Sequence, residues 1–345
     1  MTGRRPAWLL VALVVVLAVG AGIALAILLG RSSKESGATK CNGAAALCNR
    51  RLDEVFFPAT HNSYAASDQP GWHFASQRYG ISRQLDDGIR ALLLDIHMGV
   101  RDPATGRVRT DLGAEGSDRN KIAKRVPPLV LRVADFVAGG VGLGRLHGPE
   151  RPYLCHTLCE LGAEPLDEEL GVLRRFLERH PGVVVIVIVE DYIPPKTVVR
   201  AFRQARLESY VATLHRRQPL PTLGALVASG RRLIVFAEKK GGTPRWYMPA
   251  FSFIQDTPLG ATRANQLSCR RYRGAKDSPL LLVNNWIPPF PPNPRTNAAV
   301  GARAFLRQRL ERCLRKRGFA GAIVAVDFYN KTSVVDVARL LNSRS

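Results

Sequence analysis

The chain has 345 residues, of which 46% are hydrophobic, and a net charge of +22 from 50 Lys and Arg against 28 Asp and Glu. This length and composition allow a large buried core, which excludes a disordered chain and suits one barrel-sized domain or two small ones. The charge fits nucleic acid, anionic lipid or an anionic substrate, but the basic residues are scattered and no nucleic-acid motif occurs, so no nucleic-acid partner is expected. A compositional bias towards arginine accounts for much of the same charge.

Residues 7–30 form an uncharged apolar run behind Arg4 and Arg5. The run is long enough to cross a hydrocarbon core of ~30 Å. We predict one transmembrane helix there, preceded by a short basic segment at 1–6 and followed by a polar linker at 31–40 and a domain at 41–345. The alternative is a signal peptide cleaved after the Ala-Leu-Ala at 24–26, although the apolar core of such peptides usually has only ~7 to 15 residues.

Six cysteines follow the apolar run, and an even number behind an export signal predicts disulfides in an oxidising compartment. Spacing alone does not determine the connectivity; the pairs that we expect are Cys41–Cys48, Cys155–Cys159 and Cys269–Cys313. Reduced thiols in a cytoplasmic domain are the alternative. The disulfide interpretation predicts a single-pass protein of the cell membrane with its domain on the extracytoplasmic side, or a secreted protein after cleavage. The oligomeric state is not predicted.

Short apolar runs alternate with helical patterns along the rest of the chain. The strand-like runs occupy residues 54–60, 89–97, 152–156, 182–191, 231–239, 280–286 and 321–329, and the helical patterns occupy 165–180, 196–208, 297–316 and 333–342. Runs that are apolar on both faces and alternate with helices are typical of a parallel sheet covered by helices, so we expect an α/β barrel or a doubly wound sheet. Residues 101–151 interrupt this rhythm and predict an insertion on one face of the domain, such as a lid.

Polar side chains recur where the strand-like runs end. The residues concerned are His61, Asn62, Asp95, His97, His156, Glu190, Asp191, Lys239, Lys240, Asn284, Asn285 and Asp327. In a barrel of parallel strands these ends meet at one mouth, where active sites are built. Each residue alone has a structural alternative, as a loop cap, an arginine partner or a buried histidine. Together, two histidines among carboxylates and a lysine suit general acid and base catalysis near neutral pH.

Five motifs resemble the X domain of phosphatidylinositol-specific phospholipase C, in its secreted or membrane-attached branch. They are "THNSY" (60–64), "QLDDGIRALLLDIH" (84–97), "LCHTLC" (154–159), "VIVED" (187–191) and "AVDFY" (325–329), and the resemblance covers about residues 45–343. The resemblance implies a distorted (β/α)8 barrel of the TIM type. It also implies a phosphodiesterase that acts on a membrane glycerophospholipid or a similar ester, without identifying the headgroup.

The resemblance also implies roles for individual residues. His61 matches the general base that acts on the attacking hydroxyl, and His156 matches the general acid that protonates the leaving alkoxide. Asp327 is expected to orient His61, as a carboxylate fixes the tautomer of an imidazole. With a neighbouring hydroxyl as nucleophile, the first product is a cyclic phosphodiester.

A metal site and a phosphate site are further expectations. Asn62, Asp95 and Glu190 match metal-ligand positions of the calcium-dependent members, and their oxygens suit a hard cation such as Ca²⁺. Leu93 stands where those members have one more carboxylate, while metal-free bacterial members have an arginine near the position of Asp95, so whether a metal is required stays open. The groups expected at the substrate phosphate are Arg90, Lys239, Lys240 and His97, of which His97 also suits a ligand or a core position.

Two other functions compete with this interpretation. A glycerophosphodiesterase or sphingomyelinase D-like barrel usually has His-Arg-Gly at the first strand and Glu-x-Asp at the second, whereas this sequence has His-Asn-Ser and Leu-Leu-Asp. A catalytically inactive relative that only binds anionic lipid is the second alternative. The presence of both His61 and His156 argues against it.

Overall fold

The computed structural model describes residues 40–103, 106–110, 128–137, 148–288 and 291–344. Ala38–Ser345 form one compact unit. The predicted basic segment at 1–6, the transmembrane helix at 7–30 and all but the last residue of the predicted linker lie outside the described residues. Among the residues that are described, no helix is long and apolar enough to span a bilayer.

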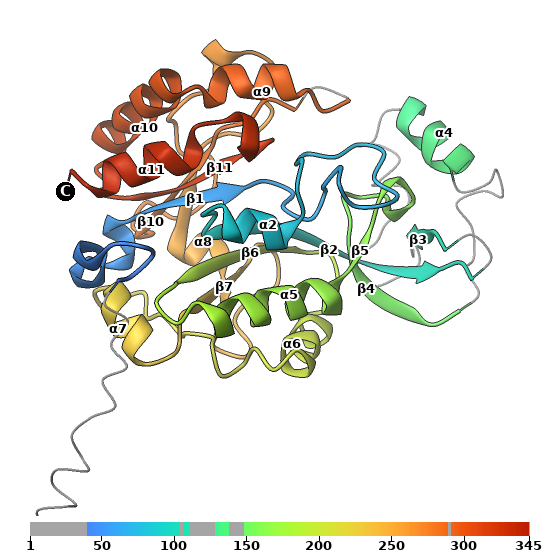
Figure 1. Ribbon diagram of the computed structural model, residues 1–345, viewed down its shortest axis with the longest axis horizontal. Helices are drawn as coiled ribbons and strands as arrows, with labels where there is room; N and C mark the ends of the chain where they lie inside the picture. The colour runs from blue at the N-terminus through green and yellow to red at the C-terminus, as the bar shows by residue number, and fades with distance from the viewer. Residues whose placement is uncertain (1–39, 104–105, 111–127, 138–147, 289–290, 345) are drawn as a thin grey trace, which may run out of the picture. The chain divides into compact units, whose positions relative to one another are not determined.

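Parallel strands form the centre of the fold (Figure 1). The strands are β1 (Phe56–Thr60), β2 (Ala91–Arg101), β6 (Val185–Asp191), β7 (Leu233–Ala237), β8 (Tyr247–Pro249), β9 (Ile254–Asp256), β10 (Leu280–Asn284) and β11 (Ala322–Val326). Their order in the sheet is β8-β7-β6-β2-β1-β11-β10-β9, with parallel pairing throughout. Chain order is thus kept around the sheet and the last strand lies beside the first, which excludes a doubly wound sheet because that topology reverses at a switch point. Within the described residues β8 and β9 are not paired, so the curled sheet is open there.

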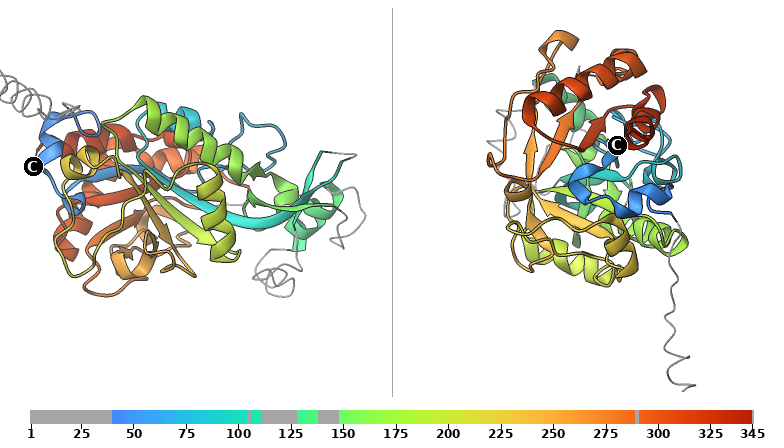
Figure 2. Two further views of the ribbon diagram at one scale, coloured as in Figure 1. Left: turned by 90° about the horizontal axis from the view of Figure 1, so that it is seen from below. Right: turned by 90° about the vertical axis from the view of Figure 1, so that its left-hand side faces the viewer.

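Helices cover the outer face of this sheet, as the two views of Figure 2 show. Those that pack in the outer cluster are α2 (Ile81–Asp86), α5 (Leu166–Arg179), α6 (Pro195–Gln204), α10 (Arg303–Arg317) and α11 (Val334–Asn342). Buried side chains of α7 (Leu223–Ala228) and α8 (Ala250–Phe253) belong instead to the cluster inside the curl, and α9 (Pro294–Gly301) packs in a separate small cluster. The predicted helices at 165–180, 196–208 and 333–342 correspond to α5, α6 and α11. The prediction of a single helix at 297–316 is wrong. Two helices, α9 and α10, are separated at Ala302, where the backbone is not helical. The carbonyl of Gly301 accepts a hydrogen bond from the amide of Ser333 and not from a residue of α10.

Alternation along each strand divides the core into two layers. Leu92 and Leu94 of β2 belong to the outer cluster with the helices, whereas Leu93 belongs to the cluster inside the curl, together with Phe57, Ile188 and other strand residues. Successive side chains of a strand point to opposite faces, so a residue two positions after an inner residue such as Leu93 also lies on the inner face. This alternation brings Asp95, Glu190 and Asp327 to the inner face at the carboxyl ends of β2, β6 and β11.

The region after β2 departs from the expected parallel pattern. Since β2 is 11 residues long, it continues beyond its parallel neighbours and pairs antiparallel with β3 (Val108–Thr110) and β4 (Glu150–Leu154), and β4 pairs with β5 (Glu164–Pro165). The run at 152–156 is therefore not a parallel strand, contrary to prediction. Helix α4 (Pro128–Val137) belongs to the predicted insertion at 101–151, much of which lies outside the described residues.

The three predicted disulfides are confirmed. Cys41 bonds to Cys48, Cys155 to Cys159, and Cys269 to Cys313. No cysteine of the sequence is left free, since all six lie among the described residues. The second bridge closes the turn that carries His156, and the third ties the segment before β10 to α10.

Candidate active site

His61 and Asp327 meet at the carboxyl ends of two adjacent strands. Thr60 of β1 lies opposite Val326 of β11, so the next residue of each strand reaches the same level of the mouth. Nδ1 of His61 lies 2.9 Å from Oδ1 of Asp327. Burial raises the pKa of Asp327, although the charge and hydrogen bond of His61 act in the opposite direction. A carboxylate acceptor at Nδ1 holds the proton on that nitrogen, which leaves Nε2 as the basic nitrogen.

Trp286 fixes the plane of the same imidazole. Its ring stacks on His61 with 4.0 Å between centroids and an interplanar angle of 9°. Trp286 follows β10 by two residues and is buried. Trp286 is not among the residues selected from the sequence, although alternation along "NNW" places it on the same face as Asn284.

His156 has a similar arrangement on the other side of β1. Its Nδ1 lies 3.1 Å from Oδ2 of Asp95 and 3.3 Å from the side-chain nitrogen Nδ2 of Asn62. Asn62 has a positive φ of 44°, a conformation that asparagine adopts more readily than most residues, and the hydroxyl of Tyr64 donates to its Oδ1. The carboxylate of Asp95 accepts the hydrogen of Nδ1, so Nε2 is again the nitrogen available for chemistry.

The pair shifts both pKa values towards the charged forms. Burial acts to raise the pKa of Asp95, but the hydrogen bond and charge of His156 outweigh it and hold the pKa below its usual value. Exclusion of water by the surrounding protein acts to lower the pKa of His156, and Asp95 reverses this, so the pKa is raised. Because the His156 side chain is 60% exposed, solvent screens part of this interaction.

Glu190 and Lys239 form an ion pair beside Asp95. Glu190 lies opposite Asp95 in the register of β2 and β6, and its carboxylate lies 3.2 Å from Nζ of Lys239. The hydroxyl of Tyr192 donates to the same carboxylate, and Nζ of Lys239 lies 3.7 Å from the centre of the Tyr192 ring. His97 stacks on the same tyrosine ring with 4.3 Å between centroids.

His97 is a neutral, buried imidazole. It is 2% exposed, and neither of its ring nitrogens has a hydrogen-bond partner among the described residues. Burial lowers its pKa to about 4. These properties suit the core position that the sequence left open better than a charged contact to a phosphate.

A second charged cluster lies on the far side of the mouth. Arg273 donates to Glu238, at 2.7 Å, and to Asp256, at 2.8 Å. Glu238 follows β7 and Asp256 ends β9, so the guanidinium joins the two sides of the opening between β8 and β9. Burial raises the pKa of Glu238 to about 7, against the effect of Arg273. Arg273 belongs to a basic "RRYR" stretch whose partners depend on tertiary contacts, so local patterns do not predict this cluster.

Arg90 and Lys240 do not join the imidazoles. Arg90 precedes β2 at the opposite end of the sheet, where it donates to the carbonyls of Leu85 and Ile89 at 2.7 Å and lies over the ring of Phe176. Burial lowers its pKa to about 10. Its expected contact with the substrate phosphate does not fit this position, because Arg90 lies just before β2 and Asp95 comes five residues later along the strand. Lys240 is exposed, next to Lys239 in sequence.

The three expected metal ligands lie together but are already bonded. Asp95 contacts His156, Glu190 contacts Lys239, and Asn62 contacts Tyr64. In the described part of the chain, no three or more His, Cys, Asp and Glu side chains are grouped so that they could hold a metal ion. Calcium takes ~6 to 8 oxygen ligands. These side chains therefore do not fit a calcium site as arranged.

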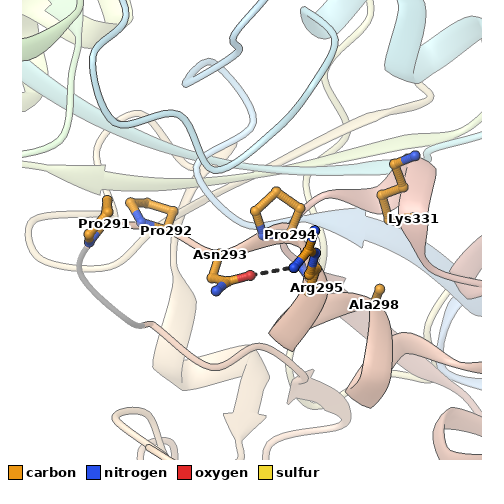
Figure 3. A pocket seen from close by; sticks show the side chains of 7 residues that line it. All are labelled: Pro291, Pro292, Asn293, Pro294, Arg295, Ala298 and Lys331. Carbon is orange, nitrogen blue, oxygen red and sulfur yellow. Dashed lines mark hydrogen bonds between the residues drawn. The ribbon is translucent and has the colours of Figure 1, made fainter.

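A surface pocket of about 780 Å³ lies beside the same end of the sheet (Figure 3). It is formed by the segment that follows Trp286 and by Lys331, which comes soon after Asp327. Its lining residues are Pro291, Pro292, Asn293, Pro294, Arg295, Ala298 and Lys331. No imidazole of the candidate site contributes to it, so the pocket adjoins the catalytic candidates without containing them.

Comparison with known proteins gives a consistent set of relatives. The family model described as PI-PLC X 1 matches residues 147–342. The PI-PLC X domain-containing protein 1 of Arthroderma benhamiae is 25% identical over 323 residues, which cover 88% of this chain and 89% of the relative. A protein of the same fungus described as an uncharacterized secreted protein is 24% identical and covers 71% of this chain and 46% of the relative.

Relatives also occur outside the fungi. A PI-PLC X domain-containing protein of Arabidopsis thaliana is 26% identical over 212 residues, which cover 55% of this chain and 48% of the relative. Among solved structures, the phosphatidylinositol-specific phospholipase C from Listeria monocytogenes aligns with a TM-score of 0.46 and 16% identity, over 85% of this chain and 94% of that chain.

Proposed function

Because this chain belongs to the PI-PLC X domain family, we propose that it is a phosphodiesterase of the phospholipase C type acting on a membrane phospholipid. We take its curled sheet as the distorted (β/α)8 barrel that the sequence predicts. One observation carries the proposal: two imidazoles at the mouth are each bonded through Nδ1 to a buried carboxylate, His61 to Asp327 and His156 to Asp95.

His61 acts as the general base. Its Nδ1 proton is held by Asp327, so Nε2 is free to take the proton of an attacking hydroxyl. The hydroxyl oxygen then forms a bond to phosphorus. Asp327 stabilises the imidazolium that results, and Trp286 keeps the ring in one plane while the proton moves.

His156 acts as the general acid. The phosphorus–oxygen bond to the leaving group breaks, and the oxygen that keeps the electron pair takes the proton from Nε2. The raised pKa of His156 supports this role, because it keeps the donor form present at higher pH. When the nucleophile is a hydroxyl of the headgroup itself, the product is a cyclic phosphodiester.

Lys239 supplies positive charge beside the phosphate. Its ammonium lies next to Glu190, on the strand adjacent to Asp95. Cations aimed at phosphoryl oxygens stabilise the negative charge that develops in the transition state. No step of this proposal passes through calcium, and the Ca²⁺ expectation from the sequence is left to experiment.

The disulfides and one relative support a location outside the cytoplasm. Three bridges use all six cysteines, and such bridges are typical of proteins in an oxidising compartment. A relative at 24% identity is described as secreted. We propose that the domain acts on the extracytoplasmic side, either anchored through residues 7–30 or released after cleavage.

Cleavage of phosphatidylinositol vesicles tests the proposal. The protein is assayed with Ca²⁺ and with chelator, beside vesicles of other phosphodiester lipids. His61→Ala and His156→Ala are expected to abolish release of an inositol phosphate. His215→Ala is the matched control and is expected to leave the rate unchanged, because this histidine is exposed in the loop after Val211, which pairs with the first residue of β7 at the amino end of that strand.

The outcomes separate the alternatives. Turnover of another lipid in place of phosphatidylinositol would keep the mechanism and change the substrate. Activity that disappears with chelator would restore Asn62, Asp95 and Glu190 as metal ligands. No turnover of any lipid, together with vesicle binding, would favour an inactive lipid-binding relative.

A further inference from the structure

Helix α4 exposes apolar side chains on one face. Phe136 is 83% exposed and Leu129 is 58% exposed. Their exposed fractions are larger than those of Leu259 and Tyr272, the other large apolar side chains that are exposed within the described residues. Leu129, Arg132 and Phe136 are spaced by three and four residues, so they share one face of the helix. Arg132 is exposed as well.

The opposite face of α4 attaches the helix to the candidate active site. Val130 and Ala134 are buried against Leu158, which lies within the turn that carries His156, and Leu161, which follows it. Figure 1 shows α4 beyond the carboxyl end of β2, on the side of the domain to which β1 and β2 point. A surface that binds α4 would therefore lie next to the general acid.

The occupant that fits this face is an anionic bilayer. Large exposed apolar groups rarely gather on one face unless the face binds something. Apolar anchors with a basic side chain between them are the pattern of helices that lie in the interface of a membrane, where the basic group meets lipid phosphates. The net charge of +22 favours a negative surface over a neutral one.

We infer that α4 is a docking helix for an anionic lipid surface, with Leu129 and Phe136 entering the interface and Arg132 at the headgroups. The inference deepens the proposed function, because it gives the route by which a lipid substrate reaches His156. The inference concerns contact with lipid and the proposed function concerns catalysis, so docking and turnover are measured by separate assays.

Site-specific labelling tests docking without any enzyme assay. Since no native cysteine is free, Phe136→Cys in the full chain can be labelled with a polarity-sensitive dye, and Leu259→Cys is the matched exposed control. With the protein bound to or reconstituted in vesicles of phosphatidylcholine and phosphatidylserine, the dye at 136 is expected to shift to the blue and to be protected from aqueous iodide. The dye at 259 is expected to stay accessible. Equal accessibility at the two positions would overturn the inference.

A second pair of variants tests the consequence for turnover. The double variant Leu129→Ser/Phe136→Ser is expected to cleave anionic vesicles about tenfold more slowly, because two interfacial anchors are lost, and to keep the parent rate on a water-soluble phosphodiester. Leu259→Ser is expected to match the parent on both substrates. Equal losses on both substrates would contradict a docking role. Absence of all turnover in the parent would instead refute the proposed function, while the labelling result would still decide docking.

Discussion

Asp327→Asn tests whether His61 depends on its buried carboxylate. The substitution keeps the size of the side chain and removes its charge, at a position that is 3% exposed. An amide can donate a hydrogen to Nδ1, which moves the proton of the neutral ring to Nε2. In that tautomer His61 has no free electron pair at Nε2 with which to accept a proton from the nucleophile.

The expected loss follows from the contact that is removed. A hydrogen bond between charged groups contributes ~1.5 to 3 kcal/mol. The His61 and Asp327 side chains are 21% and 4% exposed, so little of this interaction is screened by water. Since ~1.4 kcal/mol corresponds to tenfold in rate, kcat should fall by about 10- to 150-fold, and the wrong tautomer adds to this loss.

Steady-state kinetics on phosphatidylinositol vesicles measure the effect. We expect kcat to fall and KM to stay within about twofold, because the base acts on the reaction and not on binding. Asp87→Asn is the control: this carboxylate accepts from the hydroxyl of Tyr329 but contacts neither imidazole. A kcat loss below about threefold, or ~0.6 kcal/mol, in a folded Asp327→Asn protein would refute the assigned role.

Three further predictions concern the acid, the stacked ring and one disulfide. Asp95→Asn should lower the pKa of His156, because Asp95 raises it, so the protonated donor is lost at lower pH and the alkaline limb of the pH–rate profile should move to lower pH. Trp286→Ala should reduce kcat about two- to tenfold through loss of a stacking contact of ~0.5 to 1.5 kcal/mol, whereas Trp286→Phe, which keeps an aromatic ring, should retain most of the rate in the same assay. Replacing Cys269 and Cys313 together by Ser should lower the free energy of unfolding by about 4 kcal/mol, measured by denaturant titration, because the bridge spans a separation of 44 residues.

Strand alternation and the position of polar residues made much of the site predictable. Asp95, Glu190 and Asp327 each follow an apolar run that is buried on both faces, so the sequence already indicates that they reach one mouth. His61 was found in the same way, whereas His156 follows the antiparallel strand β4 and reaches the mouth because β2 extends beyond its parallel neighbours. Each imidazole lies beside a carboxylate in the structure. These contacts join neighbouring strands, which is why local patterns were sufficient.

Other features depend on geometry that local patterns do not contain. The stacking of Trp286 on His61 joins β10 to β1, which are separated by β11 in the sheet. β8 and β9 have three residues each, too few to show a periodic pattern. Arg90 lies at the start of the predicted strand at 89–97, so the chain direction already placed it at the end of the sheet away from the carboxyl ends. The register of β2 agrees with that placement, so the expectation of a phosphate contact at Arg90 did not follow from the strand pattern.

The unpaired edge between β8 and β9 affects how much the mouth can change its width. Elsewhere adjacent parallel strands are held by ladders of backbone hydrogen bonds, which resist separation together. At this edge Arg273 contacts Glu238 through side chains, whereas its contact with Asp256 also uses the backbone of residues 272 and 273. Side chains can change rotamer without breaking a strand, so the contact between Arg273 and Glu238 can open without the loss of a backbone ladder. A headgroup of larger size is therefore most easily accommodated on this side, and breadth of substrate choice should depend on residue 273 more than on either imidazole.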